Sequence, residues 1–305
     1  MNENRNLIST SAGVLGSHKR YVVWFYLLNL LFAWWGTGTF TSSARSIMDH
    51  SLYAEKVVHG MDIFVVLQLL AQPDFGPTRS STVPAMSFAI AFFLVCVVFM
   101  PGVLLGYSSD HRVSRDEFFR ACGHNLWRFV RVFVMYAIIG GIIAGVLFGM
   151  HVGLSKAADQ SANDDRIPYF TRLGTLLIIF LIMTVVRAWF DLAQTDVVLR
   201  DQAAARRSIA AAWRMTWRNL WRIWGTYVLI ALIGLAILIG GVWLWHLIVP
   251  PASVFGAFLV SQAILLLLLA VRFWQRAAAV ALYLRQAAEP ELPPHATALT
   301  AVQVS

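Results

Sequence analysis

Charged residues are scarce in this sequence. Only 13% of the 305 residues are Asp, Glu, Lys or Arg, about half the share of a typical soluble domain. Hydrophobic residues make up 58%, and the mean hydropathy is +0.65. Because a water-soluble domain needs charged side chains over its surface, the composition excludes an ordinary soluble protein and predicts a chain embedded in lipid.

Cysteine and catalytic motifs are also lacking. The two cysteines, Cys96 and Cys122, are too few for a disulfide framework or a cysteine-based metal site, so both are predicted to be free thiols. The sequence has no G-x-S-x-G elbow, no Walker loop and no paired carboxylates inside an apolar run. These absences predict a protein that is not an enzyme and that has no cofactor.

A metal site is not predicted either. Several histidines and aspartates fall in segments that we expect on one side of the membrane, but none has a His-x-x-x-His or Glu-x-x-His spacing. These residues are Asp49, His50, His59, Asp62, His151 and His246.

Long apolar runs take the place of the missing charge. Each is about 20 residues, enough to cross a hydrocarbon core of roughly 30 Å as a helix. Unbroken apolar runs exclude the alternating strands of a membrane barrel. The sequence therefore predicts an all-α polytopic transmembrane bundle over residues 21–285. Its six spans are 21–40, 86–107, 129–150, 173–190, 223–249 and 254–273.

The segments outside these spans are shorter. Residues 1–20 are predicted to form a cytoplasmic N-terminal segment and residues 286–305 a disordered cytoplasmic tail. Residues 61–71 are apolar but too few to span, so we expect a short helix on the outer face. A cleaved signal peptide is the alternative to the first span, although signal cores are usually shorter than this run.

The basic residues predict the orientation. Seventeen of the 24 Lys and Arg residues fall in segments on one side of the membrane and six on the other. Because basic loops stay in the cytoplasm, both termini are predicted to be cytoplasmic in a multi-pass protein of the bacterial inner membrane. This asymmetry accounts for most of the +8 net charge, which gives no support to a nucleic-acid partner.

One short sequence occurs twice. Residues 120–128 and 214–222 both begin with Arg and end in Asn-Leu-Trp-Arg, at an offset of 94 residues. Each copy precedes a span that runs outward. Chance in a biased composition is one interpretation, and an internal parallel repeat, related by an axis along the membrane normal, is the other.

The second copy belongs to a strongly amphipathic segment. At 100° per residue, arginines gather on one face of a helix and tryptophans on the neighbouring face. Such a helix lies in the headgroup plane, and it either anchors the bundle or binds anionic lipid headgroups on the cytoplasmic face. The candidate headgroup contacts are Arg207, Arg214, Arg218 and Arg222.

Polar residues inside the spans are further candidates. Arg187 and Asp191 are four residues apart on the fourth span, a spacing that predicts an intramembrane ion pair. The pair is either structural or part of a gate or substrate contact. Asn29 and Gln262 are expected to form hydrogen bonds between helices.

Small residues and proline predict local packing. The spacing of Gly141, Gly145 and Gly149 is typical of a helix face that another helix approaches closely, within the chain, in a homo-oligomer or in a membrane-protein partner. Pro101 and Gly102 are expected to kink or break the second span.

Two segments carry a family resemblance. Phe118-Phe119-Arg120-Ala121-Cys122-Gly123, and Asp191-Leu192-Ala193 followed by Val197-Val198, resemble bacterial six-helix inner-membrane proteins of unknown function. These are similar to the membrane domain found fused to glycerophosphoryl diester phosphodiesterases. The resemblance covers most of residues 20–285 and implies a membrane bundle. It implies no phosphodiesterase activity, because the catalytic domain of the fused members has no counterpart here.

Two functions follow as expectations. The first is a non-enzymatic membrane protein, a scaffold or accessory factor in envelope or lipid processes. The alternative is a small transporter or permease with a polar site between the halves of the repeat. A polar cavity in the middle of the bundle would favour transport, and an apolar core would favour the scaffold.

Overall fold

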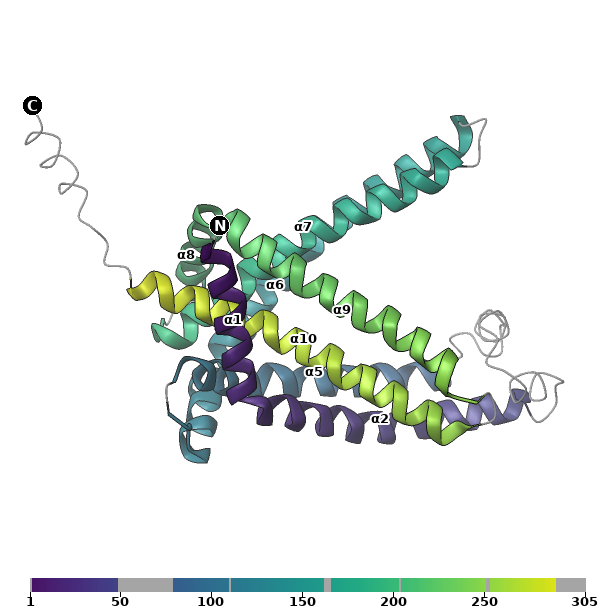
Figure 1. Ribbon diagram of the computed structural model, residues 1–305, viewed down its shortest axis with the longest axis horizontal. Helices are drawn as coiled ribbons and strands as arrows, with labels where there is room; N and C mark the ends of the chain where they lie inside the picture. The colour runs from purple at the N-terminus through teal and green to yellow at the C-terminus, as the bar shows by residue number, and fades with distance from the viewer. Residues whose placement is uncertain are drawn as a thin grey trace, which may run out of the picture.

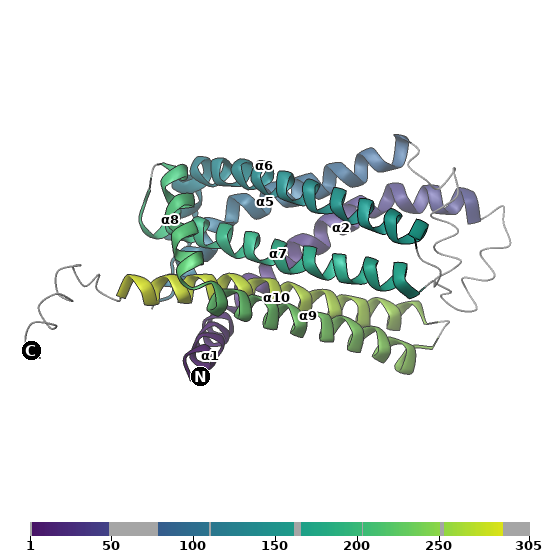
Figure 2. The ribbon, with the colours of Figure 1, turned by 90° about the horizontal axis from the view of Figure 1, so that it is seen from above.

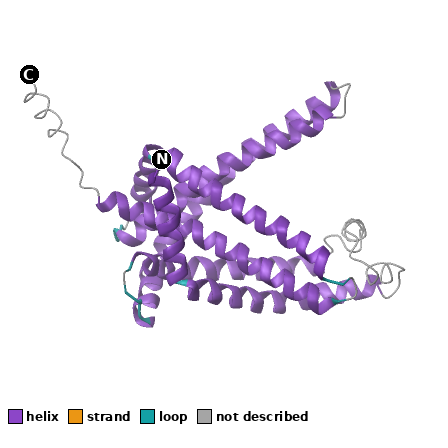
Figure 3. Cartoon of the chain, viewed as in Figure 1, coloured by secondary structure: helices purple, strands orange, loops and turns teal. Residues whose placement is uncertain are grey.

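The computed structural model describes residues 2–48, 79–109, 111–161, 166–202, 204–250 and 253–288. This part of the chain holds eight helices and no strand (Figure 3). The helices are α1 (Asn2–Ser17), α2 (Lys19–Met48), α5 (Arg79–Ser108), α6 (Arg115–Ser161), α7 (Arg166–Leu199), α8 (Ala205–Arg218), α9 (Leu220–Ile248) and α10 (Val254–Ala288).

The long apolar helices expected from the sequence are present. Within the described residues, five helices are long and apolar enough to cross a membrane: α5, α6, α7, α9 and α10. The predicted span 21–40 lies inside α2, which is a 30-residue helix but is not one of these five. The expected short helix at 61–71 lies outside the described residues, as does the tail after Ala288.

Several helices extend well beyond the predicted apolar windows. α6 begins at Arg115 instead of residue 129, and α7 continues to Leu199 instead of ending at residue 190. The start of α6 has a local cause. Ser114 and Glu117 form a reciprocal capping box, in which the Glu117 amide donates to Ser114 Oγ at 3.2 Å and the Ser114 amide donates to Glu117 Oε2 at 2.9 Å.

Pro101 does not break its helix. α5 is continuous from Arg79 to Ser108, so of the two expected outcomes, a kink or a break, the break is wrong. A proline removes only one backbone hydrogen bond, and the remaining amides of an apolar helix have no better partner than the helix itself.

The helices converge at one end of the molecule and separate at the other. α2 packs against α5, α6 against α7, and α9 against α10. Figure 1 shows the α6–α7 pair diverging from α9, α10, α5 and α2, and Figure 2 shows α1 and α8 crossing the bundle at the convergent end. We call this the α8 end and the opposite end, near Met48, Ser161 and Ile248, the distal end.

The buried core lies at the α8 end. Every buried side chain of α7 falls between Ile179 and Val197, and every buried residue of α9 between Ile223 and Gly234. The buried apolar residues of α10 run from Val271 to Tyr283. The distal halves of these helices instead expose large apolar side chains, which suits a surface in contact with lipid.

The N-terminal segment forms a helix that the sequence reading did not anticipate. α1 packs against α10, with Leu7 and Ser11 fully buried. Trp274 Nε1 donates a hydrogen bond to Ser11 Oγ at 2.9 Å. Residues 2–17 are therefore part of the bundle at the α8 end.

Candidate functional site

The amphipathic helix α8 forms one wall of an open pocket. The pocket has a volume of about 480 Å³ and lies between α8 and the adjoining parts of α6 and α7. Its lining residues are Met135 of α6, Trp189 of α7, and Arg206, Ile209, Ala210, Trp213 and Arg214 of α8.

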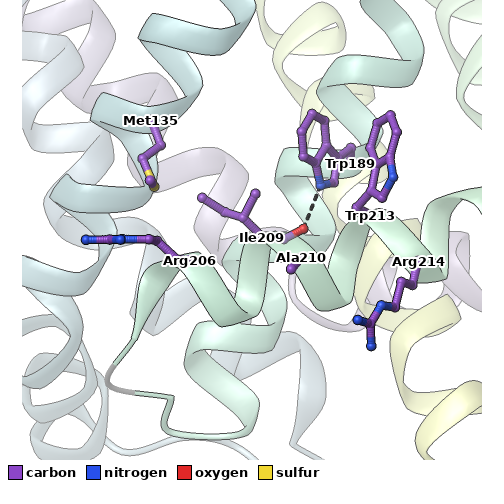
Figure 4. Close-up of a pocket in the computed structure, with 7 residues that line it drawn as sticks. All are labelled: Met135, Trp189, Arg206, Ile209, Ala210, Trp213 and Arg214. Carbon is purple, nitrogen blue, oxygen red and sulfur yellow. Dashed lines mark hydrogen bonds between the residues drawn. The ribbon is translucent and has the colours of Figure 1, made fainter.

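Aromatic and apolar groups form the middle of this pocket. Trp189 Nε1 donates to the Ile209 carbonyl at 2.9 Å, a bond that fixes α8 against α7. The rings of Trp189 and Trp213 lie 4.6 Å apart between centroids. Figure 4 shows the guanidinium groups of Arg206 and Arg214 on either side of this apolar middle. No carboxylate is among the seven lining residues, so the pocket has positive charge at both ends.

The four predicted headgroup contacts differ in their position relative to the pocket. Arg214 lines the pocket, whereas Arg207, Arg218 and Arg222 do not. Arg207 and Arg218 are exposed on α8, and Arg222 is half-buried near the start of α9. Of the four predicted arginines, Arg214 alone lines the pocket.

Arg206 is the lining residue that the sequence reading missed. On a helix drawn at 100° per residue it lies within about 20° of Trp213, while Arg207 lies on the next face. The spacing of Arg206, Ala210 and Trp213 was the available signal, because residues at i, i+4 and i+7 share one face.

The predicted pair on α7 is formed. Arg187 Nε lies 3.8 Å from Asp191 Oδ2. The same Asp191 oxygen accepts a hydrogen bond from the hydroxyl of Tyr227 on α9 at 2.9 Å, and Gln275 Nε2 of α10 donates to the Tyr227 carbonyl at 3.3 Å. Because α7 extends to Leu199, Arg187 lies twelve residues, or about 18 Å, inside the helix instead of at its end.

A second carboxylate on α7 has a matching arrangement. Asp196 is buried and accepts from the Tyr283 hydroxyl of α10 at 2.7 Å. Arg200, four residues further along, places its Nε 3.6 Å from Asp196 and is largely exposed. Each buried aspartate of α7 therefore has one tyrosine from another helix and one arginine four residues away along the chain.

A third carboxylate lies outside the spans, in the segment after α7. Asp201 accepts a hydrogen bond from Arg128 of α6, and His124 Nε2 lies 2.9 Å from it. The Arg128 hydrogen bond, followed by that from His124, lowers the pKa of Asp201 below its usual value. The ionised carboxylate thus ties α6 to the segment that leads into α8.

The two copies of the repeated sequence differ in local structure. Asn125 lies within the continuous α6, whereas Asn219 separates α8 from α9. Both side chains donate to the carbonyl four residues earlier, Asn125 to Ala121 at 3.1 Å and Asn219 to Met215 at 3.3 Å.

The remaining predicted contacts give a mixed result. Gln262 accepts from the Tyr26 hydroxyl at 3.0 Å, which confirms a hydrogen bond between α10 and α2. Both cysteines are free. A Cβ added at Gly141, Gly145 or Gly149 would meet no atom within 4 Å, so no helix approaches this face closely in the described part of the chain.

Of the six residues considered for a metal site, the structure describes only His151 and His246. His151 Nδ1 lies 2.6 Å from Thr175 Oγ1. Asp49, His50, His59 and Asp62 lie outside the described residues. Among the residues that are described, no three His, Cys, Asp or Glu side chains could share a metal ion.

Comparison with known proteins gives one match. A family model described as a domain of unknown function (DUF7847) matches residues 51–287, which include α5 to α9 and nearly all of α10. No curated protein and no solved structure matches the chain. The description of this family names no function, so the resemblance to the membrane domain fused to glycerophosphoryl diester phosphodiesterases stays a prediction.

Proposed function

The chain belongs to the DUF7847 family, and we propose from the pocket at α8 that it is a non-enzymatic integral membrane protein that binds anionic lipid headgroups. In this proposal it acts as a scaffold or accessory factor in envelope or lipid processes. The observation that carries it is the position of Arg206 and Arg214 on either side of a tryptophan-lined pocket on the amphipathic helix.

The proposed topology has six spans in a bacterial inner membrane, with α2 as the first. The N-terminus and the last described residues of α10 lie at the α8 end (Figure 1), and so do the arginines of α8. Since basic segments are retained in the cytoplasm, we assign the α8 end and both termini to that side. The parallel repeat of residues 120–128 and 214–222 belongs to this proposal, supported by the shared Asn side-chain bonds.

The composition of the pocket fits a lipid headgroup. A basic residue near an anionic membrane surface contributes about 1 kcal/mol of binding free energy. Tryptophan favours the headgroup region because its ring is apolar and its N–H is polar. Trp213 and Trp217 are 42% and 52% exposed, which leaves their rings available to lipid.

Two double substitutions with equal charge separate pocket binding from general attraction. Arg206→Gln with Arg214→Gln changes the pocket, while Arg207→Gln with Arg218→Gln removes the same charge from exposed positions of α8 outside it. Native mass spectrometry would count phosphatidylglycerol molecules that stay bound to each protein in a nonionic detergent. We expect the affinity of the pocket variant for phosphatidylglycerol to fall about 30-fold, because this variant loses two arginines that contribute about 1 kcal/mol each.

The matched variant decides the outcome. It should retain lipid nearly as well as the unmodified protein. Equal losses in the two variants would show that α8 attracts lipid only through its overall charge, and unchanged binding in both would rule out the proposal.

A transporter is the second candidate, favoured by the partly buried Arg187–Asp191 pair and by the divergence of α6 and α7 from the other helices (Figure 1). Anion flux would be measured in proteoliposomes. Transport would be favoured if Arg187→Gln abolishes the flux and the pocket variant leaves it intact. The absence of any flux would favour the lipid-binding scaffold.

A further inference from the structure

Three arginines gather around one carboxylate where α7 meets α10. Arg187 is on α7, and Arg272 and Arg276 are one turn apart on α10. Gln275, the residue before Arg276, donates to the backbone carbonyl of Tyr227, whose hydroxyl donates to Asp191, so Arg276 lies near that carboxylate. The charges of Asp191 and Arg187 both act on Arg276. Arg272 is acted on by the like charges of Arg187 and Arg276, and no carboxylate acts on it from the described part of the chain.

The one carboxylate of this group already has partners. Asp191 accepts the hydrogen bond from Tyr227 and lies beside Arg187. The next carboxylate along α7, Asp196, is paired with Arg200 and Tyr283. Three positive charges therefore face one negative charge, and two positive charges of the group are left uncompensated.

Arg276 is half-buried and poorly partnered for a charged group. Its Nε is buried and has no hydrogen-bond partner among the described residues. Its Nη1 contacts only the sulfur of Met100, and a thioether is a weak acceptor. A buried charged group without an oxygen acceptor is costly, because it has lost water and gained little in return.

The group is nevertheless open to a ligand. The Arg187 side chain is 33% exposed, Arg272 is exposed, and Arg276 is half-buried with its Nε enclosed. Arg272 lies eighteen residues after Val254, or about 27 Å along α10 from its distal end. This is the region in which α7 and α10 are in contact before they separate toward the distal end (Figure 1).

We propose that Arg187, Arg272 and Arg276 form an anion site inside the bundle that takes a phosphate-type oxyanion. The guanidinium fork matches the oxygens of a phosphate group and can donate two parallel hydrogen bonds to it. A phosphate monoester has about 1.5 to 2 negative charges near neutral pH, which equals the uncompensated charge of the group. None of the three arginines lines the α8 pocket, so the site is separate from the proposed headgroup pocket.

A phosphate oxyanion could come from a lipid headgroup or from free phosphate, and two measurements distinguish them. In a nonionic detergent without phosphate, inorganic phosphate is titrated against the full chain while the melting temperature is followed. In parallel, phosphatidic acid is added and its retention is measured by native mass spectrometry. Chloride at equal ionic strength serves as the salt control in both experiments.

Arg272→Gln is the main variant, because Arg272 is exposed and its loss leaves the core intact. We expect it to weaken binding of whichever anion the protein takes about ten- to a hundredfold, the range for a lost charge-assisted hydrogen bond. Arg276→Gln should weaken binding at least as much if it folds. Arg285→Gln is the matched control, since it removes the same charge near the end of α10, where Arg285 is half-buried and Nη2 donates a 3.4 Å hydrogen bond to Thr10 Oγ1.

A thermal measurement without any anion adds an independent test. If Arg272 faces only like charges, Arg272→Gln should melt at the same temperature as the unmodified protein or higher. A lower melting temperature would mean that Arg272 already has a partner in the chain, and it would overturn the proposal. Failure of the unmodified protein to bind either anion, or equal binding by Arg272→Gln and Arg285→Gln, would overturn it as well.

Discussion

The two ends of this bundle differ in how closely the same helices pack against one another. At the α8 end, α7, α9 and α10 bury residues such as Phe190, Tyr227 and Val280 almost completely. At the distal end the same helices leave Ile178, Trp243 and Phe255 more than half exposed. Large apolar side chains of the same helices are therefore buried at one end and exposed at the other.

This difference indicates where helix–helix contacts determine the structure. Lipid tails solvate an exposed apolar side chain as well as another helix does, so distal residues gain little from packing. Near the α8 end the helices contain buried aspartates, arginines and tyrosines that need specific partners. Substitutions at the two ends should therefore have unequal effects, which the following predictions test in order of expected size.

The largest difference is expected between two isoleucines of α9. Ile230 is 0% exposed and Ile239 is 61% exposed. Ile230→Ala should lower the free energy of unfolding by about 2–5 kcal/mol, because it leaves a cavity in a packed region. Ile239→Ala should have little effect. Thermal denaturation of both variants in the same detergent measures the contrast, and similar losses would mean that the distal half is packed in ways the isolated chain does not show.

A smaller effect is expected from the two buried carboxylates of α7. Asp191→Asn should lower the free energy of unfolding by about 1–3 kcal/mol, since it leaves Arg187 beside Arg272 and Arg276 without a negative charge. Asp196→Asn should cost less, because its partner Arg200 has a side chain that is 59% exposed and can turn to water. Chemical denaturation of the two variants compares them, and a greater loss for Asp196→Asn would contradict the proposed charge excess.

The smallest effect is expected from glycine. A Cβ at Gly102 would lie 2.5 Å from Cε2 of Phe118 and 2.8 Å from the Cys122 sulfur, whereas one at Gly145 would meet nothing within 4 Å. Gly102→Ala should cost about 1 kcal/mol, the low end for overpacking, because the Phe118 ring can shift. Gly145→Ala should be neutral or slightly stabilising, since alanine favours helix. The melting temperatures of the two variants would measure this difference. A marked fall in melting temperature for Gly145→Ala would indicate that another chain packs at Gly145.

The sequence predicted the helices better than their contacts. Apolar windows located the long helices, and the four-residue spacing of Arg187 and Asp191 predicted their ion pair, because both signals are local. The extension of α6 back to Arg115 depended on the capping box of Ser114 and Glu117. The role of Arg206 in the pocket depended on how α8 faces α7, which the amphipathic pattern of α8 alone does not define.

The sequence did not predict the tyrosine partners of the buried aspartates either, because these contacts also join residues on different helices. Tyr227 lies 36 residues from the aspartate it contacts, and Tyr283 lies 87 residues from Asp196. Residues 1–20 were predicted only as a cytoplasmic segment, because the partner that buries Ser11 of α1 is Trp274, far along the chain. Such pairings depend on the angle and register at which helices cross, and many arrangements satisfy the same apolar pattern.

Composition by itself determined that this chain consists of long apolar helices suited to lipid, because transfer from water to hydrocarbon is close to a sum over residues. Only the tertiary structure decided which end of the bundle is packed, which arginines line the pocket, and how three arginines come to share one aspartate. Those features depend on the distances between side chains on different helices, and a sum over residues contains no distances.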